Sequence, residues 1–69
     1  MLLHEKIRAL RKSKGMSQTF IAERLDMTVS SYNMKENGKR PISTTELESI
    51  SRVLEVPATV FYEENFHVK

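Results

Sequence analysis

The fold is decided by residues 17–41, which read SQTFIAERLDMTVSSYNMKENGKRP. Ser17 can cap a helix, and the apolar residues after it recur at helical spacing: Phe20, Ile21 and Leu25. We therefore expect a helix over residues 18–25 and a turn at the next two residues. Thr28 then caps a second helix, over residues 28–37.

The connection between these two helices is short, and the exit from the second is sharp. Residues 37–41 read Asn-Gly-Lys-Arg-Pro, which joins residue types that tolerate a left-handed backbone to a proline. Two helices joined by so short a turn cross at a large angle, so the second projects from the body as a rod that Tyr32 anchors. A rod of that width fits the major groove of a DNA duplex.

Three further helices complete the expected bundle. One spans Leu3 to Ser13 and stops at Gly15; one follows a capping box made by Ser43 and Glu46; a short one begins near Pro57. Their expected inward residues are Leu3, Ile7 and Leu10 in the first, Leu47, Ile50, Val53 and Leu54 in the second, and Val60 and Phe61 in the third.

The length of 69 residues provides one domain and leaves no room for a catalytic domain beside a binding module. Apolar spacing indicates no strand and no internal repeat. We expect an all-α fold, a compact bundle of about five short helices. It forms a single domain over residues 1–69, with its core at about 3–62 and a tail over 63–69.

Charge is unevenly distributed along the chain, although the net charge is only +2. Residues 1–40 hold nine Lys or Arg against four Asp or Glu, giving +5, whereas residues 41–69 hold two against five, giving −3. The solvated face of a first helix would explain its cations equally well. An anionic partner therefore needs a motif to support it.

Five motifs occur in an order and spacing typical of one family: Ile7-Arg8-x-Leu10-Arg11, Ser17-Gln18, Ile21-Ala22-Glu23-x-Leu25, Glu36-Asn37-Gly38-Lys39-Arg40-Pro41 and Leu54-x-Val56. In these motifs the chain resembles the Cro and phage-repressor type of helix-turn-helix domain, also called the xenobiotic-response-element family. The resemblance runs from about Leu3 to Phe61. It implies a lambda-repressor-like bundle that binds double-stranded DNA with the helix 28–37 in the major groove.

The resemblance also assigns residues to the reading of bases: Val29, Ser30, Asn33 and Met34. Ser30 and Asn33 can hydrogen-bond to base edges, asparagine being suited to adenine, and the two apolar side chains can meet thymine methyl groups. The implied site is rich in A·T pairs. A core position is the alternative for Met34, because methionine adapts to irregular gaps.

A second set is expected at the sugar-phosphate backbone: Gln18, Thr28, Asn37, Lys39, Arg40 and Arg11. Gln18 would otherwise be a polar first-turn residue, and residues 37–40 an ordinary helix end whose cations offset the helix dipole. The resemblance further implies an ion pair between Arg11 and Glu36, which joins the first helix to the end of the reading helix.

Three positions depart from the family pattern. Asp26 stands where glycine is usual in the turn, and aspartate tolerates positive φ better than most residues. Lys35 replaces an aromatic or aliphatic residue, so either its charge extends to the surface or the helix rotates slightly. Glu55 stands where glycine is frequent, a departure that we expect to matter less.

Other classes of function have little support. His4 and His67 have no partner at ligand spacing and are interpreted as isolated surface histidines, so we expect no metal, no cofactor and no catalytic residues. The absence of cysteine removes disulfides and thiolate zinc sites. The longest apolar runs are a few residues, which predicts no membrane span or signal peptide and makes the cytosol the expected location.

The resemblance implies a transcriptional regulator, most like a phage or mobile-element repressor, that binds a near-palindromic operator as a homodimer. The recognition helices of such a dimer lie about 34 Å apart. The alternative is a protein-interaction module, such as an antirepressor, adaptor or antitoxin. Tyr62, Phe66 and Val68 could form a self-association patch or a frayed tail. Whether the chain is complete or the leading domain of a longer regulator stays open.

Overall fold

A computed structural model of the chain describes residues 1–66 as four α-helices followed by one 3-10 helix, with no strand among them. The α-helices are α1 (Leu3–Ser13), α2 (Gln18–Arg24), α3 (Val29–Glu36) and α4 (Thr44–Leu54), and the 3-10 helix is η1 (Ala58–Tyr62). The expected all-α fold is confirmed. The last short helix is of the tighter 3-10 type, and Pro57 stands just before it.

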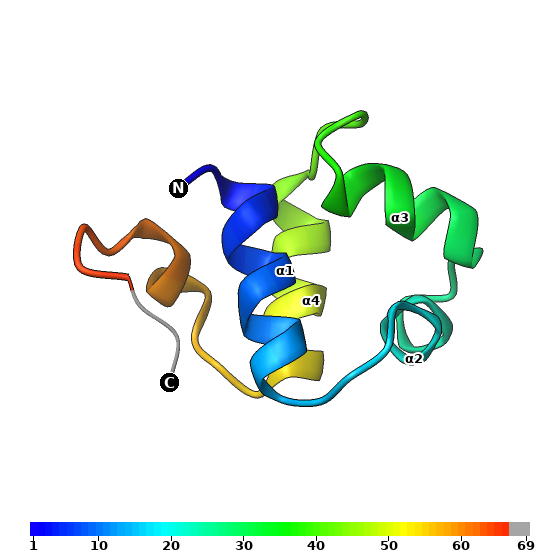
Figure 1. Cartoon of the computed structure of the whole chain (residues 1–69), viewed down its shortest axis with the longest axis horizontal. Helices are drawn as coiled ribbons and strands as arrows, with labels where there is room; N and C mark the ends of the chain where they lie inside the picture. Colours follow the sequence, from blue (N-terminus) through cyan, green and yellow to red (C-terminus); the bar gives the residue numbers. More distant parts are fainter. Residues whose placement is uncertain (67–69) are drawn as a thin grey trace.

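Figure 1 shows how the elements divide the molecule. Helices α2 and α3 lie on one side of α1 and α4, and η1 lies on the other side together with the amino end of the chain. The molecule measures 31 × 23 × 18 Å along its principal axes. The pair α2 and α3 is thus kept apart from the segment that follows α4.

Three hydroxyl groups set the starts of α2, α3 and α4. Ser17, Thr28 and Ser43 each accept a hydrogen bond from the backbone N–H three residues later, at 3.0, 3.1 and 3.1 Å. Glu46 completes the capping box by accepting from the backbone N–H of Ser43 at 2.9 Å. The helix starts expected from these residues are confirmed.

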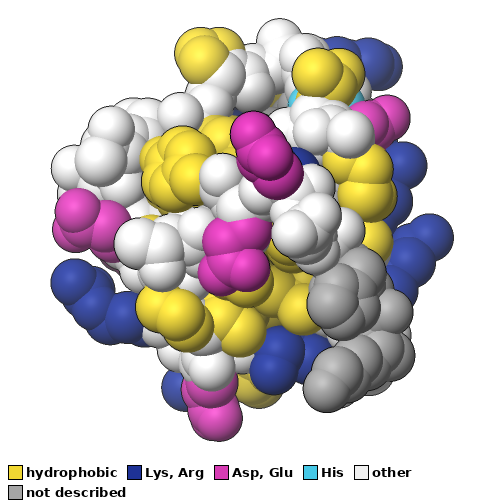
Figure 2. Space-filling model, turned by 90° about the vertical axis from the view of Figure 1, so that its left-hand side faces the viewer, with side chains coloured by type: hydrophobic (Ala, Val, Ile, Leu, Met, Phe, Trp, Pro, Cys, Tyr) yellow, Lys and Arg dark blue, Asp and Glu magenta, His cyan; other side chains and the backbone are white. Residues whose placement is uncertain are grey.

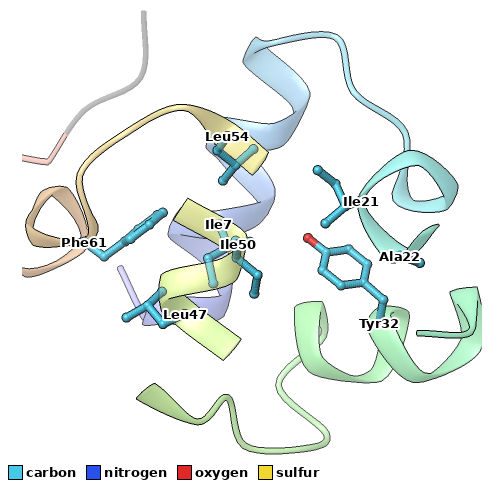
Figure 3. Packing of buried hydrophobic residues seen from close by; sticks show 8 residues of the cluster. All are labelled: Ile7, Ile21, Ala22, Tyr32, Leu47, Ile50, Leu54 and Phe61. Atoms are coloured by element: carbon cyan, nitrogen blue, oxygen red, sulfur yellow. The ribbon is translucent and has the colours of Figure 1, made fainter. Parts of the chain in front are cut away.

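The core joins all five helices, as Figure 3 shows. Its buried members are Ile7, Ile21, Ala22, Tyr32, Leu47, Ile50, Leu54 and Phe61. Phe20, one of the three apolar residues at helical spacing, is 38% exposed, and the Arg24 guanidinium lies 4.8 Å from its ring centre. The inward face of α2 is formed by Ile21 and Ala22, and Leu25 packs against it just past the helix.

Two of the departures from the family pattern adopt the left-handed backbone that favours glycine. Asp26 has φ 56° in the turn between α2 and α3, as its tolerance of positive φ suggested. Glu55 has φ 59° at the end of α4. A non-glycine residue in this conformation stores strain, so Glu55 occupies a position that favours glycine.

The segment after η1 folds back on the bundle as far as the structure describes it. The Phe66 ring stacks on Phe61 with their centres 6.2 Å apart, and the Lys6 ammonium lies 5.5 Å from the centre of the Phe66 ring. The Phe66 ring thus packs against residues of its own chain, whereas Tyr62 is 69% exposed. Figure 2 shows this side of the molecule, where hydrophobic side chains lie among charges of both signs. The expectations for His67 and Val68 lie outside the described residues.

Candidate nucleic-acid interface

The side chains of α3 that we expect to read bases lie at two depths. Val29 and Ser30, in the first turn of the helix, are exposed. Asn33 and Met34, one turn later, are half-buried. Met34 does not belong to the hydrophobic residues that pack against the core, which gives no support to its alternative role as a core filler. The start of α3 is therefore the part most open to a partner.

The far end of α3 is held from inside by Arg11 and Glu36. The Arg11 guanidinium donates to both carboxylate oxygens of Glu36, at 2.9 Å from Nε and 2.8 Å from Nη2, and Nη1 donates to the Met16 carbonyl at 2.6 Å. The Glu36 side chain is fully buried and that of Arg11 is 9% exposed. All three guanidinium nitrogens of Arg11 already have partners, so its burial works against the expected phosphate contact.

The charges of this pair stabilise each other. The hydrogen bonds that Arg11 donates to the Glu36 carboxylate are the main cause that raises the pKa of Arg11, against the opposing effect of burial. Burial by itself would raise the pKa of Glu36, but the hydrogen bonds from Arg11 and Gln18 outweigh it and hold that pKa below its usual value. Burial, helped by the nearby Glu36 carboxylate, raises the pKa of Tyr32, whose hydroxyl makes no hydrogen bond of normal geometry with the described residues.

Three side-chain amides form a row of hydrogen bonds that leads from Glu36 across α2 and α3. Gln18 Nε2 donates to Glu36 Oε1, Asn33 Nδ2 donates to Gln18 Oε1, and Asn37 Nδ2 donates to Asn33 Oδ1, each at 3.0 Å. The expected base reader Asn33 thus lies between two expected phosphate contacts, Gln18 and Asn37. The structure brings these three predicted site residues together.

Two residues of α1 that sequence reasoning did not assign to the site also hold the end of α3. Arg8 Nη2 donates to the side-chain oxygen of Asn37 and, at 3.3 Å, to the Glu36 carbonyl. The His4 ring lies so close to Gly38 that a Cβ there would meet it at 2.6 Å. The interpretation of His4 as an isolated surface histidine is therefore wrong. The spacing of His4, Arg8 and Arg11 on one helical face was the signal that could have found them.

Lys35 does not follow the first course expected for it, in which its charge extends to the surface. Its side chain is only 13% exposed, so the charge does not extend freely to the surface. The ammonium instead donates to Glu46 Oε1 at 2.9 Å and to the Pro41 carbonyl at 3.0 Å. Because Glu46 also caps α4, this lysine connects α3, the loop after it and the start of α4.

The remaining expected backbone contacts lie at the surface. Lys39 and Arg40 are exposed in the loop that follows α3, and no ion pair or hydrogen bond joins their side chains to another of residues 1–66. Thr28 is exposed at the opposite end of α3, where its hydroxyl already caps the helix. Two exposed cations therefore follow α3 directly.

Residues 1–66 offer little for a metal site or a membrane span. No cluster of three or more His, Cys, Asp or Glu side chains in this part of the chain could hold a metal ion. None of its helices is long and apolar enough to cross a membrane.

Comparison with known proteins agrees with this geometry. A family model described as helix-turn-helix matches residues 7–61. Two curated relatives, both called uncharacterised HTH-type transcriptional regulators, come from Sinorhizobium medicae (strain WSM419) and Rhizobium meliloti (strain 1021). Each is 34% identical over 59 residues, which is 86% of this chain but only 42% of the relative. No solved structure matches. The match from α1 to η1 shows that the chain belongs to the helix-turn-helix family of Cro and phage-repressor type.

Proposed function

We propose that this chain is a sequence-specific DNA-binding transcriptional regulator that inserts α3 into the major groove. The observation that carries the proposal is the contrast between the two sides of α3. Its inner side is fixed by a buried ion pair, whereas its first turn exposes Val29 and Ser30 and its exit loop exposes Lys39 and Arg40. A rigidly held helix with an open outer side, followed by free cations, suits a duplex whose phosphates flank the groove.

The residues divide into three roles under this proposal. Base edges are read by Val29, Ser30, Asn33 and Met34. Phosphates are bound by the first turn of α2 near Gln18, by Thr28, and by the loop residues Asn37, Lys39 and Arg40. We give Arg11 a positioning role through Glu36, because its side chain is only 9% exposed and each of its three guanidinium nitrogens already donates within the protein.

We further propose that the chain acts as a repressor of phage or mobile-element type and binds a near-palindromic operator as a homodimer. Exposed Tyr62, on the side away from α3, is available for self-association. Phe66 is engaged within the chain and is no longer included in that surface. The names of the two relatives support regulation of transcription, and the larger part of each relative lies outside the matched region.

Selection of bound sequences from a random duplex pool tests the proposal directly. We expect enrichment of a short two-fold symmetric motif, with affinity for the winner that falls steeply between two salt concentrations. Ser30→Ala should change the preferred sequence, whereas Thr59→Ala, which removes an exposed hydroxyl from η1, should leave it unchanged.

Two outcomes would contradict this function. Absence of any enriched motif, with only weak salt-sensitive binding, would favour a protein-interaction module. An enriched motif without two-fold symmetry would contradict the dimer alone.

A further inference from the structure

The three amides described above belong to one continuous chain of hydrogen bonds. It starts at the Arg8 guanidinium, passes through Asn37, Asn33 and Gln18, and ends at the Glu36 carboxylate. Every bond in it is donated in the same direction, from Arg8 toward Glu36. The chain crosses the half-buried side of α3 that lies beside the exposed reading face.

The charged ends determine which way each amide points. A guanidinium only donates, so Asn37 must turn its oxygen toward Arg8 and its nitrogen toward Asn33. A carboxylate only accepts, so Gln18 must turn its nitrogen toward Glu36 and its oxygen toward Asn33. Both requirements give Asn33 the same orientation, with its oxygen toward Asn37 and its nitrogen toward Gln18. An amide without such neighbours could adopt either of two orientations.

The orientation of Asn33 decides what it can offer to DNA. Each amide of the chain has two N–H donors and two acceptor lone pairs, of which the chain uses one donor and one acceptor. Asn33 therefore keeps one N–H and one lone pair, on atoms whose order along α3 is fixed. Adenine offers N7 as acceptor and N6–H as donor in the major groove, and it is recognised only when this order matches.

We propose that Arg8 is a positioning residue for base recognition: together with Glu36 at the other end, it fixes the direction of the amide chain and so makes Asn33 specific for an adenine. This inference rests on the proposed function. Arg8 need not touch the DNA, because it acts through Asn37. Its side chain is 39% exposed, and its guanidinium is joined to the end of α3 by hydrogen bonds to the Glu36 carbonyl and to Asn37.

The test compares Arg8→Met with Lys12→Met. Both remove one cation from α1, but Lys12 is exposed and no contact of its side chain is found among the described residues. One probe is the duplex selected above. The second probe carries G·C in place of one A·T pair, which is the pair that the Asn33→Ala variant no longer distinguishes from G·C. The measured quantity is the ratio of the two dissociation constants.

We expect wild type and Lys12→Met to discriminate by about tenfold or more, and Arg8→Met to lose part of that ratio, because Asn37 is then free to turn while Glu36 still orients Gln18. Arg8→Met combined with Asn33→Ala should discriminate no worse than Asn33→Ala alone, because both changes remove the same recognition. In nitrogen-proton NMR spectra of the free protein, Arg8→Met should shift the side-chain amide signals of Asn37 and Asn33, and Lys12→Met should not.

The outcomes separate this inference from the function on which it rests. If no duplex is enriched, the proposed function fails. If a duplex is enriched but Arg8→Met weakens binding to both probes equally, as loss of a charge would, the positioning role of Arg8 is overturned alone. Thermal unfolding checks that Arg8→Met is folded. Should it unfold, Asn37→Ala breaks the same chain one bond later and is expected to reduce the ratio likewise.

Discussion

Among single residues, Gly38 has the clearest reason to be glycine. Its φ is 76°, and a Cβ would meet atoms of the His4 ring at 2.6 to 3.0 Å. Gly15 offers a matched comparison, since its φ is 70° but nothing lies within 4 Å of its Cβ position. The two glycines share the backbone requirement and differ only in the space around them.

We predict that Gly15→Ala costs about 1 kcal/mol through the left-handed backbone alone. Gly38→Ala should cost at least about 1 kcal/mol more, because the His4 ring must also move. Adding His4→Ala to Gly38→Ala should remove much of the extra cost. Urea unfolding measures all of these free energies, and equal losses for the two glycine variants would show that His4 yields freely.

Glu36 is the residue on which most of the interface depends, because Arg11, Gln18 and Arg8 all contact it. Glu36→Gln leaves the Arg11 charge nearly buried without a counter-ion, which we expect to cost about 3 kcal/mol at neutral pH. Glu48→Gln, an exposed change on α4, is the control and should cost almost nothing.

The cost of Glu36→Gln should also depend on pH. The folded chain holds the pKa of Glu36 below its usual value, so the unfolded chain takes up the proton first as pH falls. The stability that the carboxylate contributes is therefore complete above its ordinary pKa and is lost as pH falls through the folded value. The gap between wild type and variant should narrow below about pH 4.5. A gap independent of pH would contradict this account.

Among the elements, helix starts were predictable from sequence and helix faces less so. Ser17, Thr28 and Ser43 act locally, through a backbone N–H three residues away, so the sequence itself contains their partners. Spacing alone did not separate Phe20, which is exposed, from Ile21, which is buried. Arg8 and His4 were missed because their partners lie on α3 or just beyond it, about 30 positions later, and only the packing of α1 on α3 brings them together.

The lysine at position 35 shows how an element can tolerate a departure from the family pattern. Most of its side chain is covered, while its ammonium reaches Glu46, whose pKa is lowered first by the Ser43 backbone N–H and then by Lys35. The stem thus replaces an apolar side chain, and the charge finds a partner that the cap of α4 already holds in place.

We predict that Lys35→Met changes the free energy of unfolding by less than about 1 kcal/mol, because methionine keeps the packed stem and Glu46 keeps its bond to Ser43. Lys35→Ala, which removes the stem as well, should cost more. Chemical denaturation of the two variants decides the matter. A loss above about 2 kcal/mol for methionine would mean that the ion pair, and not the packing, holds the loop after α3.

On the scale of the whole molecule, the distribution of charge is the property that bears on DNA. Residues 1–40 have a net charge of +5, but some of these charges already have partners inside the fold. Arg11 pairs with Glu36, and Lys35 pairs with Glu46. The cations left for phosphates are those at the surface, of which Lys39 and Arg40 stand directly after α3. Net charge therefore predicts less about binding than the position of a few unpaired cations.

The salt dependence of DNA binding should differ between variants of two exposed arginines, Arg40 and Arg52. Arg40→Ala and Arg52→Ala each remove one exposed cation and change the net charge equally, but Arg52 lies in the last turn of α4. If Arg40 contacts a phosphate, its loss should flatten the plot of log affinity against log salt by about one unit, on selected and random duplexes alike. Arg52→Ala should leave that slope unchanged. Equal effects of the two variants would mean that the whole field of the protein attracts the duplex, and that the loop after α3 makes no local contact.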